Sequence, residues 1–196
     1  MIQILAAPVG SLQTNCYIVW GDDSDQCLVI DPGDDPEQIL AMVRARERSV
    51  AAILLTHGHF DHVGGVKAIQ EVSGCKVYLH KADLDLPSQL TAVSIPATDY
   101  YAEGERLQIA GVEIQILHTP GHTPGSVCLV CEDVIFSGDT LFAGTCGRTD
   151  FPGGSYTQIL QSLKRLAALE GNYRVLPGHA EQTSLEAERK NNPFMG

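Results

Sequence analysis

Four possible metal ligands lie within six positions near residue 60 of the 196-residue sequence. Residues 51–62 read AAILLTHGHFDH, in which an apolar run is followed by His57, His59, Asp61 and His62. Neutral imidazoles and carboxylates are side chains that zinc, iron and manganese accept as ligands. Three of the seven histidines of the chain fall in these six positions, which favours a metal site over a polar loop with solvated histidines.

A second candidate ligand follows a later apolar run. Residues 117–126 read LHTPGHTPGS and contain His118 and His122. Pro and Gly stand between these two histidines and disfavour a helix, so they are not the helical pair of a zinc protease. We interpret His122, at the tip of the Pro-Gly turn, as a ligand and His118 as a structural residue that ends the strand.

Two further segments repeat the arrangement of strand, turn and polar side chain. Residues 134–140 read VIFSGDT and place Asp139 at the end of an apolar strand, and residues 174–180 read RVLPGHA and place His179 after a Pro-Gly turn. Asp139 alone would be read as a helix cap or turn former. Together with the histidines it is better explained as a bridging carboxylate, because its two oxygens can bind two cations. The four segments together predict a binuclear site.

Short β-branched runs alternate with turns and helical patterns along the whole chain. Because hairpin-like groups of strands are separated by helices, two sheets covered by helices fit better than one doubly wound parallel sheet. The expected strands are residues 2–5, 16–19, 27–30, 51–55, 76–79, 107–109, 112–117, 127–130, 134–136 and 174–176. The expected helices are residues 36–46, 63–72, 81–86, 156–169 and 184–191.

Composition and charge limit the possible partners. The net charge is −11 with histidine neutral, and no Lys or Arg cluster stands out, so that phosphate backbones and anionic membranes are repelled at long range. We expect a small-molecule substrate and neither nucleic acid nor a membrane as partner, and the sequence favours no particular oligomeric state. The N-terminal residues lack the pattern of a signal peptide, and no apolar run approaches about 18 residues. A cytoplasmic protein is therefore expected.

The six cysteines are expected to be reduced thiols. The chain is long and of mixed α/β pattern, which is unlike a small disulfide-rich secreted domain. Cys128 and Cys131 form a C-x-x-C pair within a predicted strand. Positions i and i+3 of a strand point to opposite faces, so this pair is expected to be buried rather than to close on one metal.

The motifs together resemble those of the metallo-β-lactamase superfamily. The motifs that carry the resemblance are T-H-G-H-F-D-H at 56–62, P-G-H-T-P-G at 120–125, S-G-D-T-L-F at 137–142 and L-P-G-H at 176–179. Asp31-Pro32-Gly33 after an early strand also matches. Within the superfamily the chain is similar to the glyoxalase II branch, the hydroxyacylglutathione hydrolases, and Asn192-Pro193-Phe194 supports that branch. The resemblance implies an α/β fold, a four-layer αββα sandwich.

The resemblance also assigns the ligands to two cations. It implies His57, His59 and His122 on the first metal, Asp61, His62 and His179 on the second, and Asp139 between them. It implies two divalent ions, with zinc ranked first and iron or manganese as alternatives. Asp61 would in addition orient the attacking hydroxide.

The sequence departs from glyoxalase II in its substrate-binding residues. Glyoxalase II continues into a C-terminal helical domain that contacts glutathione, whereas residues 1–196 correspond to a single metallo-β-lactamase-like domain. Residues 144–154 read GTCGRTDFPGG. Arg148 falls where the family carries a glutathione-binding lysine, and Asp150 replaces a nearby tyrosine. Arg148 is thus a candidate for binding an anionic substrate tail, and an ion pair with Asp150 is the alternative.

The expected reaction is hydrolysis of a thioester such as S-lactoylglutathione by a metal-bridging hydroxide. A thiol leaves readily, because its pKa is only about 8.5. The Gly-Arg-Thr-Asp-Phe stretch is shared with persulfide dioxygenases, which would use one iron on His57, His122 and Asp139. This is the second hypothesis, and hydrolysis of another small ester or a lactone is the third.

Overall fold

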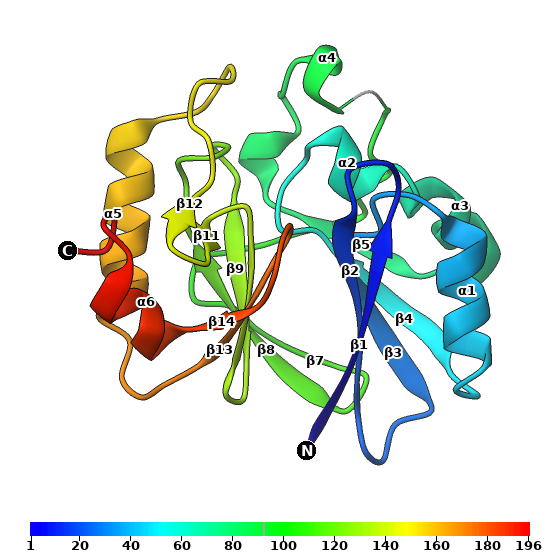
Figure 1. Ribbon diagram of the computed structural model, residues 1–196. Coiled ribbons are helices and arrows are strands. Elements are labelled where there is room, and N and C mark those ends of the chain that lie inside the picture. Colours follow the sequence, from blue (N-terminus) through cyan, green and yellow to red (C-terminus); the bar gives the residue numbers. More distant parts are fainter. Residues whose placement is uncertain (92) are drawn as a thin grey trace.

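The structure is a computed structural model that describes residues 1–91 and 93–196. Two six-stranded sheets face each other, and helices cover the outer face of each sheet (Figure 1). The order of layers is helix, sheet, sheet, helix. This confirms the expected αββα sandwich.

The first sheet is built from the N-terminal half of the chain in the order β1-β2-β3-β4-β5-β6. Hairpins join its first three strands in antiparallel pairs, and the remaining neighbours are parallel. Parallel neighbours require a crossover, which α1 and α3 provide. The strands are β1 (Ile2–Val9), β2 (Thr14–Gly21), β3 (Gln26–Ile30), β4 (Ser49–Leu54), β5 (Lys76–Leu79) and β6 (Asp99–Tyr100).

The second sheet has the order β14-β13-β10-β9-β8-β7. Its neighbours are antiparallel except β10 and β13, which are parallel and joined through α5. The strands are β7 (Arg106–Ile109), β8 (Val112–His118), β9 (Val127–Cys131), β10 (Val134–Gly138), β13 (Arg174–Pro177) and β14 (Thr183–Ser184). A separate small hairpin consists of β11 (Leu141–Phe142) and β12 (Thr145–Cys146).

The helices fall into outer layers and connections at the sheet edge. Helices α1 and α3 pack on the first sheet, and α5 and α6 pack on the second. A Ser side chain caps α5 and another caps α6, each by accepting a backbone N–H bond. The helices are α1 (Pro36–Arg44), α2 (Phe60–Val63), α3 (Val66–Ser73), the 3-10 turn η1 (Lys81–Asp83), α4 (Ser88–Thr91), α5 (Tyr156–Ala167) and α6 (Leu185–Asn191).

An apolar layer between the two sheets holds the sandwich together. Tyr17 and Leu28 of the first sheet meet Ile114, Leu129 and Phe136 of the second, all buried. Each such aliphatic or aromatic side chain contributes about 1.5–3 kcal/mol when it is fully removed from water. This packing fixes the inner faces of the two sheets against each other.

All six cysteines are free thiols, as expected. Cys128 belongs to the apolar cluster under α5, whereas Cys131 belongs to the cluster between the sheets. The two thiols therefore point to opposite faces of β9, which confirms the prediction from strand geometry.

The expected helix over residues 63–72 is wrong in its extent. The helix in this region is α3, which begins only at Val66, and the preceding residues 60–63 form the separate short helix α2, which ends before Gly64 and Gly65. The N–H of Gly65 donates to the carbonyl of Pro32 at 2.8 Å, and a Cβ on Gly64 would lie 2.3 Å from the carbonyl oxygen of Gly33. The Asp-Pro-Gly turn after β3 thus packs into the helix break.

Other sequence predictions differ in length. The helix expected over residues 81–86 is only the three-residue turn η1, and the helix expected from residue 36 ends at Arg44. The two-residue strands β6, β11, β12 and β14 and the short helix α4 were not expected, because such short elements leave no periodic pattern. No helix within the described residues is long and apolar enough to cross a membrane.

Four strands end at the same edge of the sandwich. β8 and β13 both run parallel to β10, as the pairings through β9 and directly with β13 require. β4 reaches the same edge, where the N–H of Val127 donates to the carbonyl of Thr56 at 2.9 Å. The segments after β4, β8, β10 and β13 therefore meet, and these are the four segments with candidate ligands.

Candidate metal centre

Three buried imidazoles form the first ligand cluster. His57 and His59 follow β4, and His122 follows β8. Their ring centroids lie 4.6–4.8 Å apart with the rings nearly perpendicular. Nε2 of His122 lies 2.9 Å from Nδ1 of His59, and the three rings offer nitrogen atoms that all lie within 4.8 Å of one another. Neutral imidazole nitrogens that converge in this way can coordinate one cation.

Asp61, His62 and His179 form the second cluster. Nε2 of His179 lies 3.0 Å from Oδ2 of Asp61 and 3.3 Å from Nε2 of His62. Nε2 of His62 lies 3.6 Å from the same carboxylate oxygen. α2 supplies Asp61 and His62, whereas His179 follows β13. The structure therefore brings together the two groups of residues that the resemblance assigned to two separate cations.

Asp139 lies between the two clusters. Its Oδ2 is 3.6 Å from Nε2 of His122 and 3.7 Å from Nε2 of His179, and its Oδ1 is 3.4 Å from Nε2 of His62. A single carboxylate thus faces one ligand of the first cluster and two of the second. This position suits a bridging ligand, and that role stays a prediction.

The donor atoms fit divalent cations. Nε2 of His57, Nε2 of His59 and Oδ1 of Asp139 are buried without a hydrogen-bond partner among the described residues. Buried polar atoms are nearly always hydrogen-bonded or bound to a cation or water. Buried nitrogen and carboxylate oxygen atoms that lack a hydrogen-bond partner are the ligand atoms that a metal site requires.

Hydrogen bonds behind the ligands orient two of the rings. Nδ1 of His122 lies 2.8 Å from the carbonyl of Arg148 and donates to it. Nδ1 of His62 lies 2.9 Å from Oδ2 of Asp31. A proton on Nδ1 leaves the lone pair on Nε2, so that both rings turn a ligand atom toward Asp139.

Asp31 was not recognised as a functional residue from the sequence. It follows β3 with a φ of 49°, and it is 1% exposed. Its carboxylate accepts from the backbone N–H of Thr56 at 2.8 Å, from the Thr56 hydroxyl at 2.6 Å, and from His62. The signal in the sequence was the Asp-Pro-Gly turn after an apolar strand. Asp31 ties this turn to the segment that carries the ligands.

Asp83 was also missed, and it connects two ligand segments. Its carboxylate accepts from the N–H of Gly58 at 2.9 Å, from the N–H of Gly125 at 2.6 Å and from the hydroxyl of Thr123 at 2.8 Å. Gly58 stands between two candidate ligands, and Thr123 follows His122. Asp83 therefore sets the distance between the two segments of the first cluster.

The two clusters hold protons differently when no cation is bound. Burial and the neighbouring histidines keep the pKa of His57 well below its ordinary value and lower that of His59 to about 3. Burial also opposes protonation of His62, but Asp139 and Asp31 outweigh it and raise the pKa to about 9. The hydrogen bond with Asp61 raises the pKa of His179. His57 and His59 are therefore neutral at pH 7, the state that a metal requires.

Arg148 lies beside the centre but is engaged in an ion pair. Its guanidinium donates to both carboxylate oxygens of Asp150, at 2.8 and 2.7 Å, and stacks 3.8 Å above the ring of Phe151. Phe151 in turn lies edge-on to His59 at 5.9 Å. The alternative expected from the sequence, an ion pair with Asp150, is present. A role for Arg148 in binding the substrate stays a prediction.

His118 lies outside the centre, as expected. Its Nε2 lies 2.8 Å from the carbonyl of Pro124, and its ring stacks on that of His80 at 4.2 Å. It therefore supports the turn that carries His122.

The sequence pattern of the metallo-β-lactamase superfamily matches residues 9–179. A hydroxyacylglutathione hydrolase, GloC from Haemophilus influenzae, is 34% identical over 203 residues, which cover 96% of this chain and 95% of the relative. Both matches span the four ligand segments. The similarity extends over almost the whole of both proteins.

Solved structures show the same fold. A B3 metallo-β-lactamase, BLEG-1, superposes with a TM-score of 0.88 at 36% identity and covers 100% of this chain and 99% of its own. TTHA1623, solved in a di-iron-bound form, gives 0.85 at 40% identity, with 97% and 99% covered. ETHE1 from Myxococcus xanthus gives 0.85 at 28% identity, with 97% and 83% covered. The chain is therefore a metallohydrolase that belongs to the metallo-β-lactamase superfamily.

Proposed function

We propose that this protein hydrolyses a thioester, with S-lactoylglutathione as the first candidate substrate, at a site that holds two divalent cations. The observation that carries the proposal is the position of Asp139 between the two clusters. The similarity to a hydroxyacylglutathione hydrolase along the full chain supports the substrate class.

The cations would be held by the residues of the two clusters, with Asp139 shared. Two divalent cations at such a site supply a water of lowered pKa, near about 7, and polarise a carbonyl oxygen. We rank zinc first, because imidazole and carboxylate donors suit it, and manganese remains an alternative. Iron gains support from the similarity to TTHA1623, which was solved with two irons.

Asp61 is the residue that we propose to orient the attacking water. Its carboxylate is 15% exposed, and it accepts from His179 at 3.0 Å through Oδ2. The hydrogen bond from His179 and the charge of His62 outweigh burial and lower the pKa of Asp61 to about 2. Asp61 is thus ionised at pH 7 and can accept a hydrogen bond from water. A thiolate leaves without a general acid, because the pKa of a thiol is about 8.5.

The two other hypotheses from the sequence make different use of the site. A persulfide dioxygenase with one iron would employ His57, His122 and Asp139. That reaction would assign no role to Asp61, His62 and His179, although their ligand atoms lie within 4.8 Å of one another. A hydrolase of another small ester or a lactone would use the same residues as a thioesterase and differ only in the substrate. We therefore place the dioxygenase second. The cytoplasm, which we expect from the sequence as the compartment, is also part of the proposal.

Metal content and hydrolysis measured on one sample test the proposal. We expect two metals per chain by mass spectrometry, together with turnover of S-lactoylglutathione, in protein purified without chelator. His62→Ala should lower both. Asp99→Asn, at an exposed ion pair with Lys76, is the control and should leave both unchanged. One iron per chain, no hydrolysis and oxygen uptake with glutathione persulfide would establish the dioxygenase instead.

A further inference from the structure

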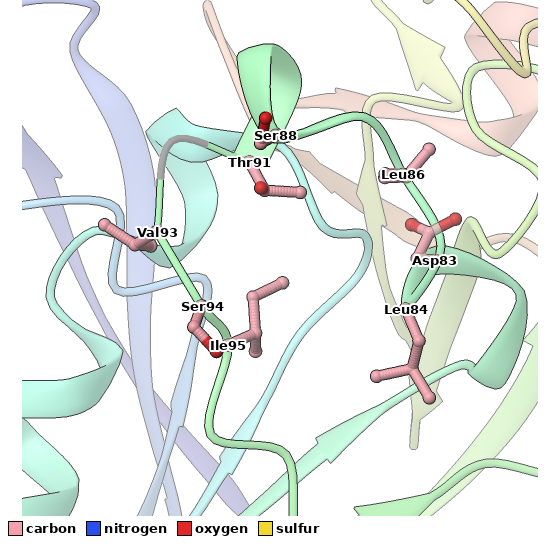
Figure 2. A pocket seen from close by; sticks show the side chains of 8 residues that line it. All are labelled: Asp83, Leu84, Leu86, Ser88, Thr91, Val93, Ser94 and Ile95. Atoms are coloured by element: carbon pink, nitrogen blue, oxygen red, sulfur yellow. The ribbon is translucent and has the colours of Figure 1, made fainter.

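A cavity of about 390 Å³ lies between the segment that follows η1 and the segment at residues 93–95 (Figure 2). Its lining consists of four aliphatic side chains, two serines, one threonine and Asp83. The aliphatic residues are Leu84, Leu86, Val93 and Ile95. The side chains of Ile95 and Thr91 point into the space between the two segments (Figure 2). The size falls within the range of small-molecule sites, roughly 300–1,000 Å³.

The described lining of this cavity presents no free charge. Asp83 is its one ionisable residue, and it is only 1% exposed. Its two carboxylate oxygens already accept from Gly58, Gly125 and Thr123. An ionic group placed in the cavity would lose hydration without gaining a counter-charge, which is costly. The cavity therefore suits an uncharged aliphatic group, and the hydroxyls can accommodate one polar substituent.

Two of the side chains that line the cavity, Leu86 and Asp83, lie against the segment of the first ligand cluster. A Cβ atom on Gly58 would lie 3.2 Å from Cδ1 of Leu86, and Gly58 stands between His57 and His59. On its other side Leu86 approaches Gly153, where a Cβ atom would lie 3.7 Å from Cδ2. Helix α4, which carries Thr91, contacts α2, which carries Asp61. A group that occupies the cavity thus lies next to the segment of residues 57–59 and to the helix pair that includes α2.

We propose that this cavity binds the aliphatic acyl chain of the thioester substrate, an inference that rests on the proposed function. The acyl chain is assigned here because the thiol carrier, where it is glutathione, bears carboxylates that the uncharged lining excludes. Arg148 lies in a different segment, where its guanidinium stacks on Phe151, and the ring of Phe151 lies edge-on to His59. The protein should therefore select thioesters by the length of an uncharged acyl chain.

A series of S-acyl glutathiones with acetyl, butyryl and hexanoyl chains tests this inference. Each buried methylene should raise kcat/KM about three- to fourfold until the cavity is filled. Thr91→Trp should fill the cavity and abolish this increase with chain length. Thr157→Trp, at an exposed position of α5, is the matched control and should keep it. Ser94→Phe provides a second filled variant should Thr91→Trp fail to fold.

Binding without catalysis separates this inference from the proposed function. Hexanamide, an uncharged analogue of the acyl group, should shift the methyl NMR signals of Leu84, Leu86, Val93 and Ile95, and the shifts should vanish in the filled variants. Equal kcat/KM across the acyl series with unmoved methyl signals would overturn the acyl site. The acyl site would also be overturned if kcat/KM depended on the length of an alkyl chain on the sulfur side of the thioester and not on the length of the acyl chain. Methyl shifts without hydrolysis of any thioester would reject the proposed function and support an aliphatic site.

Discussion

Nδ1 of His62 lies 2.9 Å from Oδ2 of Asp31, although the two residues are 31 positions apart in the sequence. Both side chains are buried, and the same carboxylate accepts two hydrogen bonds from Thr56. The orientation of one ligand of the second cluster is thus set by a residue that is itself outside the ligand set. A hydrogen-bond partner behind a ligand ring, such as Asp31, is expected to influence the metal affinity as well as the position of the ring.

Asp31→Asn should weaken metal binding about 10–100-fold. Asn tolerates the left-handed φ of 49° at this position, so that the substitution removes the negative charge and largely keeps the backbone. Competition with a chelator of known affinity measures the change, and the second metal should be lost first. Asp99→Asn, at an exposed ion pair with Lys76, serves as the control. Unchanged affinity in Asp31→Asn would show that the carboxylate has no effect on the metal.

Asp83→Asn should lower the occupancy of the first cluster more than that of the second. An amide has one acceptor oxygen for three donors, and leaving a buried donor unsatisfied costs about 1–3 kcal/mol. The segments that carry His59 and His122 would then no longer be held at a fixed distance. Metal analysis after dialysis at limiting metal concentration should find about one metal retained per chain.

Glu188→Gln is a matched control for this substitution. Glu188 is also a buried carboxylate that joins segments, and it accepts from Gly144, Thr183 and Asn192 at 2.7–2.9 Å. It lies outside the two ligand clusters, so that its loss should lower the free energy of unfolding without changing the ratio of the two metals. Equal effects of the two substitutions on metal content would contradict a specific role for Asp83.

The metal-free protein should be most stable near pH 6.5, the ordinary pKa of histidine. The lowered pKa values of His57 and His59 stabilise the fold above that pH, and this stabilisation is lost as the pH falls toward about 3. The raised pKa values of His62 and His179 stabilise the fold below it, and for His62 this is lost as the pH rises toward about 9. Urea unfolding of chelator-treated protein at several pH values measures the maximum.

Bound metal should change this pH profile. Ligand imidazoles bind metal only without a proton on the ligand nitrogen, so that the stability of the loaded protein should continue to rise above pH 6.5. A steady rise with pH in the metal-free protein as well would contradict the protonation states inferred for the second cluster.

The ligand segments could be predicted because each has a strong local signal, whereas the four-layer αββα fold was implied by the resemblance to a known family. An apolar strand followed at once by His57, His59 and Asp61 is visible without any tertiary information, and the period of the strands fixes which side chains face inward. The placement of these residues at one edge depends in addition on a contact between the two sheets, where the N–H of Val127 donates to the carbonyl of Thr56. Local patterns therefore sufficed to identify the candidate ligands, and their division between two cations came from the resemblance.

Asp31 and Asp83 could not be recognised in the same way. Each is one acidic residue next to a turn, where Asp is common for reasons of backbone conformation alone. Their function arises from long-range partners, His62 for one and Gly125 for the other. The break between α2 and α3 was missed for a related reason, because the packing of Gly64 against Gly33 is a tertiary contact that helical periodicity does not contain.

Arg148→Ala and Asp150→Ala should change KM for S-lactoylglutathione in opposite directions. If Arg148 binds an anionic tail, its removal should raise KM about tenfold with little change in kcat, because a hydrogen bond to a charged group is lost. The bidentate pair with Asp150 competes for the same guanidinium, so that Asp150→Ala should free it and lower KM. The double variant should resemble Arg148→Ala, since Asp150 acts only through Arg148. Should both single variants instead raise KM equally, the pair would serve to anchor the segment at residues 147–154, and Arg148 would not contact the substrate.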